Sequence, residues 1–410
     1  MKKFFALLLS LAMVLALVAC GQKDPTPDTP DTPDDTTPEV EYKIAMITDY
    51  GDITDQSFNQ TTYEACKAFA EDNSIEFSYF KPAGDNTADR VAMIEKAVDE
   101  GFNVIVMPGY AFGGAIVEAA PEFPDVKFIA LDVAAGDLLE TAVAKAGEAY
   151  DYTPENWDLN KYVDMSNVYC AVYQEELCGY MAGYAAVKLG YKNLGFLGGM
   201  SVPAVVRYGY GFVQGVDAAA ADLGLTDVKL NYIYGGQFFG DADITAVMDT
   251  WYQGGTEVVF ACGGGIYTSA VDAAKKVGAK VIGVDVDQAG VIAKYAGVDG
   301  MTVTSAMKGL YPATYDTLTD VIVNGNWDKY VGKIATLGLV SGTDPEANYV
   351  QIPMGDGTQW SDSFTQDDYK AMVKDMFDGK ITVSNNTSSD VSAADFATVI
   401  TVDDQGSIKG

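Results

Sequence analysis

The chain has 410 residues, of which 48% are hydrophobic, 58 are acidic and 26 are basic, and none is histidine. Its formal charge of −32 disfavours binding to a phosphate backbone, so we expect no nucleic acid partner. The lack of histidine excludes Ser-His-Asp and Cys-His catalysis and every histidine-liganded metal site. The first strand-to-helix turn also lacks G-x-G-x-x-G, and no Walker motif occurs. For these reasons together we expect a protein that is not an enzyme and needs no cofactor or metal.

The N-terminal segment has the pattern of an export signal. Lys2 and Lys3 precede an apolar run, residues 4–18, that is shorter than the roughly 20 residues of a stable membrane-spanning helix. We predict a signal peptide over residues 1–19. The run ends in LVAC, which resembles a bacterial lipobox whose cysteine, here Cys20, is acylated. Acyl chains would then anchor the protein to the bacterial cell membrane from outside the cytoplasm; the alternative is an ordinary cleaved signal with a chance cysteine.

Residues 20–41 are predicted to form a disordered linker. The stretch DPTPDTPDTPDDTTPEVE contains prolines, threonines and acids, with almost nothing to bury. Such a composition does not offset the entropy lost on ordering. We expect the segment to tether a globular body to the membrane.

From residue 42 onward, apolar runs that end at Gly, Asp or Pro alternate with stretches of helical spacing. The strand-like runs are Lys43–Thr48, Ile75–Phe80, Val104–Met107, Lys127–Leu131, Val168–Tyr173, Leu194–Leu197, Lys229–Tyr234, Val258–Cys262, Lys280–Val284 and Met301–Ser305. The helix-like stretches include Phe58–Glu71, Asp89–Glu100, Glu175–Lys188, Val205–Asp222, Ile244–Trp251 and Tyr267–Val277. This alternation predicts an α/β fold with parallel sheets covered by helices on both faces.

So many strands exceed one ordinary sheet, and we predict two doubly wound parallel-sheet lobes joined by a hinge around a cleft. We expect the first lobe to contain residues 42–169 and about 286–340, and the second to contain residues 170–285 and about 341–385. The hinge is predicted near Tyr169–Gln174 and Asp285–Ala289. Residues 386–410 form an extension that could pack as a strand or stay loose.

The loops that follow the strands are rich in carboxylates, aromatic rings and glycine. In open parallel sheets, ligands bind at the carboxyl ends of the strands. The first such loop, TDYGDITDQSFNQ, covers residues 48–60. Together these loops suit an uncharged, planar, polyhydroxylated ligand, because rings stack on phenylalanine and hydroxyl groups bond to Asp and Lys.

Several motifs, in this order, resemble the basic membrane protein family of bacterial lipoproteins, which are nucleoside-binding receptors of ABC importers with the type I periplasmic-binding-protein fold. The motifs are D-x₅-D-x-SFNQ at Asp49–Gln60, GG-x₃-PAVVR at Gly198–Arg207, GF-x-x-GV at Gly211–Val216, Y-x-x-x-F at Tyr234–Phe238, CGGG at Cys262–Gly265, IGVDVDQ at Ile282–Gln288 and TSAMK at Thr304–Lys308. The similarity extends from about residue 42 to about residue 383.

The resemblance implies that a flat base stacks between Phe58 and Phe238, one ring from each lobe. Each ring could instead belong to the core, and the adjacent Phe239 leaves the second ring undecided. Asn59 and Asp49 match residues that hydrogen-bond the base edge or the sugar, although Asp49 also suits a turn or helix cap. Of the other acids in this loop, we expect Asp55 to cap the helix and Asp52 to be solvated.

Asp285 and Lys308 match the pair that grips the ribose hydroxyls. The alternative is a salt bridge that locks the hinge. Gly263 and Gly264 would admit the ligand to a backbone amide, and Arg207 could pair with an acid across the lobe interface.

The function implied is that of a monomeric, membrane-anchored receptor that closes its lobes on a nucleoside, with purines the first candidates, and docks on the permease and ATPase of an ABC importer. A sugar or autoinducer receptor of the same fold is the alternative among binding proteins, and a nucleoside hydrolase is the alternative among enzymes. Cys170 and Cys178 could form a disulfide or remain free thiols.

Overall fold

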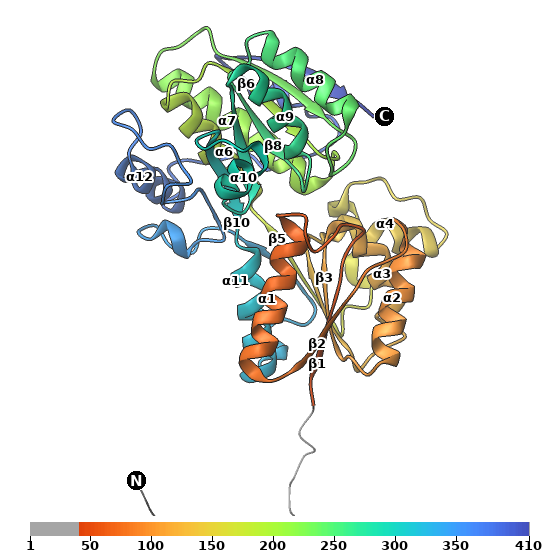
Figure 1. The fold of residues 1–410 in the computed structure, drawn as a ribbon. Coiled ribbons are helices and arrows are strands. Elements are labelled where there is room, and N and C mark those ends of the chain that lie inside the picture. The colour runs from red at the N-terminus through yellow and green to blue at the C-terminus, as the bar shows by residue number, and fades with distance from the viewer. Residues whose placement is uncertain (1–40, 410) are drawn as a thin grey trace, which may run out of the picture. The chain divides into compact units, whose positions relative to one another are not determined.

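The structure is a computed structural model that describes residues 41–409. The predicted signal peptide, the lipidated Cys20 and all but the last residue of the predicted linker lie outside the described residues. Residues 42 onward form one compact unit. Its two sheets and their helices define a first and a second lobe (Figure 1).

The first lobe contains a six-stranded sheet in which every pair of neighbours is parallel. Its order is β11-β5-β4-β3-β1-β2. The strands are β1 Lys43–Ile47, β2 Glu76–Phe80, β3 Val104–Pro108, β4 Lys127–Leu131, β5 Val168–Tyr173 and β11 Lys333–Leu337. Its helices are α1 Phe58–Asn73, α2 Thr87–Asp99, α3 Gly113–Ala119, α4 Ala135–Lys145, α5 Leu159–Tyr162 and α11 Leu310–Leu318.

The second lobe contains a seven-stranded sheet with the order β12-β10-β9-β8-β6-β7-β13, parallel except that β12 runs against β10. The strands are β6 Asn193–Gly198, β7 Lys229–Tyr234, β8 Val258–Cys262, β9 Lys280–Asp285, β10 Thr302–Lys308, β12 Val350–Gln351 and β13 Thr401–Ser407. Its helices are α6 Glu175–Lys188, α7 Pro203–Asp222, α8 Ala242–Gln253, α9 Tyr267–Val277, α10 Ala289–Ala296 and α12 Gln366–Phe377.

Alternate residues along each strand supply two separate cores. In β1, Ile44 and Met46 pack on the side of α1 and α11, whereas Ala45 and Ile47 pack on the side of α2, α3 and α4. The second sheet divides its residues in the same way between α6, α7 and α12 on one face and α8, α9 and α10 on the other. Because both faces are covered, central strands such as β3 and β8 are buried and apolar throughout, which explains why they read as continuous runs in the sequence. The predicted α/β fold with two doubly wound lobes is confirmed.

Glycines allow the long helices α6 and α7 to pack closely. A Cβ atom at Gly179 would clash with the backbone oxygen of Tyr208, and one at Gly211 would clash with that of Glu176. The two backbones therefore approach each other where larger side chains would separate them.

The sheets divide the chain differently from the predicted lobe boundaries. β5, which begins before residue 170 and ends after it, belongs wholly to the first sheet, and β10 belongs to the second. The predicted boundaries at residues 169/170 and 285/286 are therefore wrong. A strand's lobe depends on which strands it pairs with, and a local pattern does not contain that information.

The chain crosses between the lobes at Gln174, at Gly309 and over residues 338–349. Hydrogen bonds link the crossings, since Gln174 N donates to Leu337 O over 2.9 Å and Gly309 N donates to Tyr349 O over 2.7 Å. The first predicted hinge segment, Tyr169–Gln174, thus ends at Gln174, where the chain crosses between the lobes. The second, Asp285–Ala289, is wrong because β9 and α10 lie in the same lobe.

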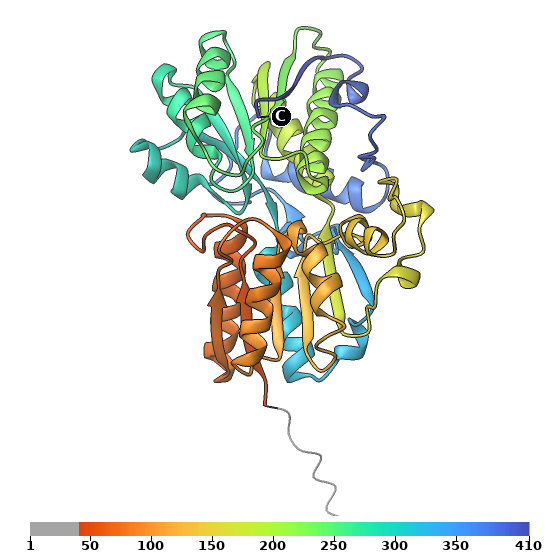
Figure 2. The same cartoon turned by 90° about the vertical axis from the view of Figure 1, so that its right-hand side faces the viewer.

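After α12 the chain returns along the second lobe, and β13 pairs in parallel with β7 at the edge of the sheet (Figure 2). The extension therefore packs as a strand, one of the two predicted possibilities. Cys170 and Cys178 are free, buried thiols. Within residues 41–409, no helix has the length and apolar composition needed to cross a membrane.

Candidate functional site

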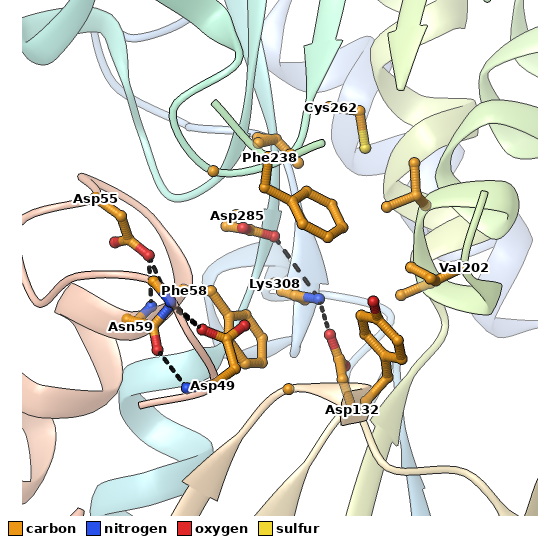
Figure 3. Close-up of a pocket in the computed structure, with 18 of the residues that line it drawn as sticks. Asp49, Asp55, Phe58, Asn59, Asp132, Val202, Phe238, Cys262, Asp285 and Lys308 are labelled. Carbon is orange, nitrogen blue, oxygen red and sulfur yellow. Dashed lines mark hydrogen bonds and ion pairs between the residues drawn. The ribbon is translucent and has the colours of Figure 1, made fainter. Parts of the chain in front are cut away.

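A cavity of about 400 Å³ lies between the carboxyl ends of the two sheets (Figure 3). In the first sheet the chain reverses its direction of strand addition between β1 and β3, and in the second it does so between β6 and β8. Such points leave a crevice beyond the strand ends where ligands bind in open α/β sheets. The cavity is lined by all eight residues predicted for the ligand: Asp49, Phe58, Asn59, Phe238, Gly263, Gly264, Asp285 and Lys308.

Asp49 is fixed in a turn directly after β1. Its Oδ1 atom accepts hydrogen bonds from the backbone N–H groups of Tyr50 and Gly51, each over 2.6 Å, and from Asn59 Nδ2 over 3.2 Å. Burial raises the pKa of Asp49, and these hydrogen bonds oppose the rise. The turn role considered for Asp49 is therefore present, and it holds the carboxylate rigidly on the cavity wall.

Asp55 caps the start of α1. Its carboxylate accepts from the backbone N–H groups of Ser57, Asn59 and Gln60 over 2.9–3.1 Å, as well as from Asn59 Nδ2 over 3.0 Å. The predicted cap role is confirmed. Asp52 is exposed and forms an ion pair of 2.9 Å with Lys81, in agreement with its predicted solvation.

The two predicted stacking rings both border the cavity, and they come from different lobes. Phe58 is the first residue of α1 and packs against core residues of both lobes. The Lys308 Nζ atom lies 4.6 Å from the centre of its ring. Phe238 follows β7 in the second lobe and points into the cavity, whereas the neighbouring Phe239 is 57% exposed. The geometry thus favours Phe238 over Phe239 as the second ring.

Phe238 rests on glycine backbone. A Cβ atom at Gly263 would lie 2.7 Å from its ring, and one at Gly199 would overlap the ring. The Phe238 carbonyl also accepts a hydrogen bond from Gly265 N over 2.8 Å. The glycines therefore seat the ring, a role that differs from the predicted opening of a backbone amide to the ligand, which stays a prediction.

Lys308 lies among three carboxylates at the base of the cavity. It forms ion pairs with Asp132, with Glu175 at 3.5 Å and with Asp285 at 3.7 Å. Burial by itself would lower the pKa of Lys308, but the carboxylates raise it above its ordinary value. Burial also raises the pKa of Asp132 to about 6, and the charge of Glu175 adds to that rise. The ammonium is therefore firmly charged, whereas the carboxylates compete for it.

Asp285 joins the two lobes. Its backbone has a φ of 64°, and its Oδ2 atom accepts a hydrogen bond of 2.5 Å from the Ser57 hydroxyl of the first lobe. Its Oδ1 atom accepts from the Tyr208 hydroxyl over 3.2 Å. Each carboxylate oxygen has two lone pairs, so Asp285 can accept further hydrogen bonds from a diol.

Arg207 pairs with Glu175 over 2.6 Å, and both belong to the second lobe. The predicted pairing across the lobe interface is therefore wrong for Arg207, because its helix α7 packs directly on α6. The pairing that crosses the interface is made instead by Lys308 and Asp132.

Sequence reasoning missed two residues of this network, Asp132 and Glu175. Asp132 directly follows β4, and this strand-end position was the signal that could have selected it. Glu175 begins α6, is fully buried, and has no local signal. The Asp132 Oδ1 and Glu175 Oε1 atoms are buried without a hydrogen-bond partner among the described residues. Asp132 lines the cavity, so its Oδ1 atom is available to a polar group there, whereas Glu175 lies behind the cavity wall and its Oε1 atom faces Lys308 at 3.5 Å.

Comparisons with known proteins agree with this architecture. Residues 42–345 match the family model of the PnrA-like ABC transporter substrate-binding proteins, Bmp. The chain is 25% identical over 389 residues to the ABC transporter nucleoside-binding protein BmpA of Lactococcus lactis subsp. cremoris, covering 92% of this chain and 96% of that one. It is 26% identical over 322 residues to basic membrane protein B of Borreliella burgdorferi, covering 76% and 83%.

Solved structures show the same fold. A solute-binding protein of an ABC transporter system from Aeropyrum pernix superposes with a TM-score of 0.59 at 19% identity, covering 84% of this chain and 88% of that one. A protein of the same description from Conexibacter woesei gives a TM-score of 0.58 at 20% identity, covering 84% and 99%. With the family model matching most of the chain, the protein belongs to the Bmp family of PnrA-like substrate-binding proteins of ABC transporters.

Proposed function

We propose that this substrate-binding protein captures a nucleoside, with purines as the first candidates, and delivers it to the permease and ATPase of an ABC importer. The observation that carries the proposal is the arrangement of two aromatic rings and an Asp/Lys pair around one cavity. Phe58 and Phe238 border it from opposite lobes, and Asp285 and Lys308 lie at its base. A planar base and a ribose diol need these two kinds of partner.

The size and charge of the cavity support an uncharged ligand of nucleoside size. A volume of about 400 Å³ lies within the range usual for small-molecule sites. Six acidic residues line it, namely Asp49, Asp52, Asp55, Asp132, Asp137 and Asp285, against the two cations Arg207 and Lys308. A phosphate group would meet a net negative wall, so we expect nucleotides to be excluded.

Closure of the lobes would couple binding to transport. The ligand contacts proposed here come from both lobes, so a bound nucleoside favours the state in which the lobes are together. Asn59 and Asp49 would hydrogen-bond the base edge from the first lobe. Gly263 and Gly264 would let a backbone amide approach the ligand from the second.

Titration calorimetry on the chain from Gly21 onward, with guanosine, inosine, adenosine and uridine, tests the ligand. We expect saturable heat with at least one purine nucleoside, and a rise in the melting temperature with the same compound. No heat and no thermal shift with any nucleoside would overturn the assignment.

Two controls separate the alternative ligands and activities. Ribose should not displace inosine if the base contributes binding energy, whereas displacement would indicate a sugar receptor. Incubation with inosine should release no hypoxanthine, since release would indicate a hydrolase.

We also propose that Cys20 is lipidated and anchors the protein outside the cytoplasm. The support is the LVAC sequence after an apolar run, and uncharacterised relatives from Pyrococcus are named as lipoproteins. Labelling of cells with a palmitate analogue should mark the wild type and not Cys20→Ala. Equal labelling of both would contradict the site. We expect the soluble form to be a monomer in sedimentation analysis.

A further inference from the structure

The segment that follows α12 is fastened along the second lobe at three places. Near its start, Ser384 and Gln214 exchange hydrogen bonds of 2.8 and 3.0 Å. Farther on, the Asp217 carboxylate accepts from the backbone N–H groups of Thr398, Val399 and Ile400 over 2.8–3.2 Å. β13 then pairs with β7, so the segment covers what would otherwise be the edge of the sheet.

A further fastening, at Lys409, lies behind the loop that carries Phe238. Lys409 donates to Gln237 Oε1 over 2.7 Å and forms an ion pair with Asp241. The backbone of Lys409 also lies against Gly236, which has a φ of 79°. Lys409 is thus in contact with the residues on both sides of Phe238 in the sequence.

The loop that carries Phe238 is rich in glycine, so ordering its backbone costs more conformational entropy than ordering an average segment. Residues 235–240 include three glycines and must follow a path without regular secondary structure between β7 and α8. Its inner side is held by backbone hydrogen bonds from Gly235 to Gly198 and from Gly236 to Gly199. On the outer side, Gln237 donates hydrogen bonds to Phe239 O and Asp241 Oδ2. The Lys409 ammonium contacts both Gln237 and Asp241, so it completes one connected network there.

We propose that Lys409 is a positioning residue for the binding site, holding the 235–241 loop so that the Phe238 ring is preformed against Gly199 and Gly263. The effect on affinity rests on the proposed function, since it requires that Phe238 contacts the ligand. The effect on the loop itself does not. Preforming a contact ring reduces the ordering that binding would otherwise require.

The test uses Lys409→Ala in the soluble chain, with Lys409→Arg as the conservative variant. Lys380→Ala is the matched control, because it removes a lysine that forms ion pairs with Asp375 and Asp378 elsewhere on the second lobe. Amide hydrogen exchange of the ligand-free protein measures how firmly the 235–241 loop is held. We expect amides 236–240 to exchange at least about fivefold faster in Lys409→Ala, with little change in Lys409→Arg or Lys380→Ala.

Calorimetry with the nucleoside that binds most tightly measures the affinity of the binding site. We expect Lys409→Ala to weaken binding roughly three- to tenfold, as the loss of one partly buried charged pair with its hydrogen bonds would. In a Phe238→Leu background, the same substitution should have no further effect, because the lysine acts through that ring.

The outcomes separate the two proposals. Unchanged exchange at 236–240, or an equal loss of affinity with and without the Phe238 ring, overturns the positioning role. Faster exchange in a protein that binds no nucleoside overturns the proposed ligand and leaves the loop support standing.

Discussion

The Lys308 ammonium, at the end of β10, forms an ion pair with Asp132, which follows β4 in the other lobe. Both side chains are almost fully buried, and Lys308 also lies within ion-pair distance of Glu175 and Asp285. One cation therefore serves three carboxylates from two lobes. The expected ribose contact and the link between the lobes are built from the same residue.

The first prediction concerns the loss of either charge from this pair. Lys308→Met would leave the buried carboxylates of Asp132 and Asp285 without a cation, whereas Glu175 keeps its ion pair with Arg207. We expect the substitution to reduce the free energy of unfolding by about 3–5 kcal/mol. Asp132→Asn should cost much less, because Lys308 keeps two carboxylates and asparagine tolerates the φ of 59° at this position. Urea unfolding of both variants measures the difference, and equal losses would contradict the shared-cation account.

The second prediction concerns the diol contact at Asp285. Asp285→Asn keeps the shape and suits the φ of 64°, but it removes the charge that strengthens hydrogen bonds from ribose hydroxyls. We expect it to weaken nucleoside binding at least about tenfold, and to reduce the preference for a nucleoside over its 2′-deoxy analogue. Calorimetry with the two ligands provides the comparison. An unchanged preference would place the ribose elsewhere.

The third prediction separates the aromatic rings. Phe58→Leu and Phe238→Leu keep apolar bulk and lose the flat face, so each should cost roughly 1–3 kcal/mol of binding free energy. Phe239→Leu, at the exposed neighbouring ring, should change affinity by less than about twofold, since a largely exposed side chain loses little burial. Binding measured for all three variants under one condition decides between Phe238 and Phe239, and a larger effect at Phe239 would reverse the assignment.

The fourth prediction concerns the glycine seat of Phe238. Gly263→Ala would place a methyl group 2.7 Å from the ring at a φ of 144°, so we expect a weaker nucleoside complex as the ring is displaced. Gly101→Ala is the control, because it has a φ of 90° with open space around it. It should lose stability from backbone strain while keeping affinity. If both variants bind like the wild type, the ring does not depend on this seat.

The fifth prediction concerns pH. Burial raises the pKa of Asp137 to about 7, an effect opposed by the Ala134 N–H and by Arg207. The folded state therefore binds more protons than the unfolded state between about pH 4 and 7, so this group lowers stability as the pH rises through that window. Asp137→Asn retains an acceptor for Ala134 N and removes the titration.

We expect the ligand-free Asp137→Asn variant to gain roughly 2 kcal/mol over the wild type between pH 5.5 and 7.5, measured as the change in unfolding free energy. Because the other carboxylates titrate in both proteins, their contributions to the pH dependence of stability cancel in this difference. A difference that stays constant with pH would show that Asp137 is ionised across the whole range.

Apolar runs and short motifs were enough to predict most of the strands and helices and much of the cavity wall. Strands such as Val258–Cys262 are buried on both faces, so their apolar runs are visible locally, and the residues after them must meet at one edge of a parallel sheet. That is why the loops after these strands could be placed at one cleft. The choice of Asp49, Phe58, Phe238 and Asp285 within those loops came from the resemblance to the basic membrane protein family.

The lobe that each strand joins, and the contacts between charged side chains, could be read only from the three-dimensional structure. The sheet that a strand enters depends on pairings such as β5 with β4, β10 with β9 and β13 with β7, and local periodicity does not encode these pairings. The Asp132 contact of Lys308 and the Lys409 contact behind Phe238 follow from those pairings. Burial then set the electrostatics, because carboxylates are forced to share one cation only after water has been removed from around them.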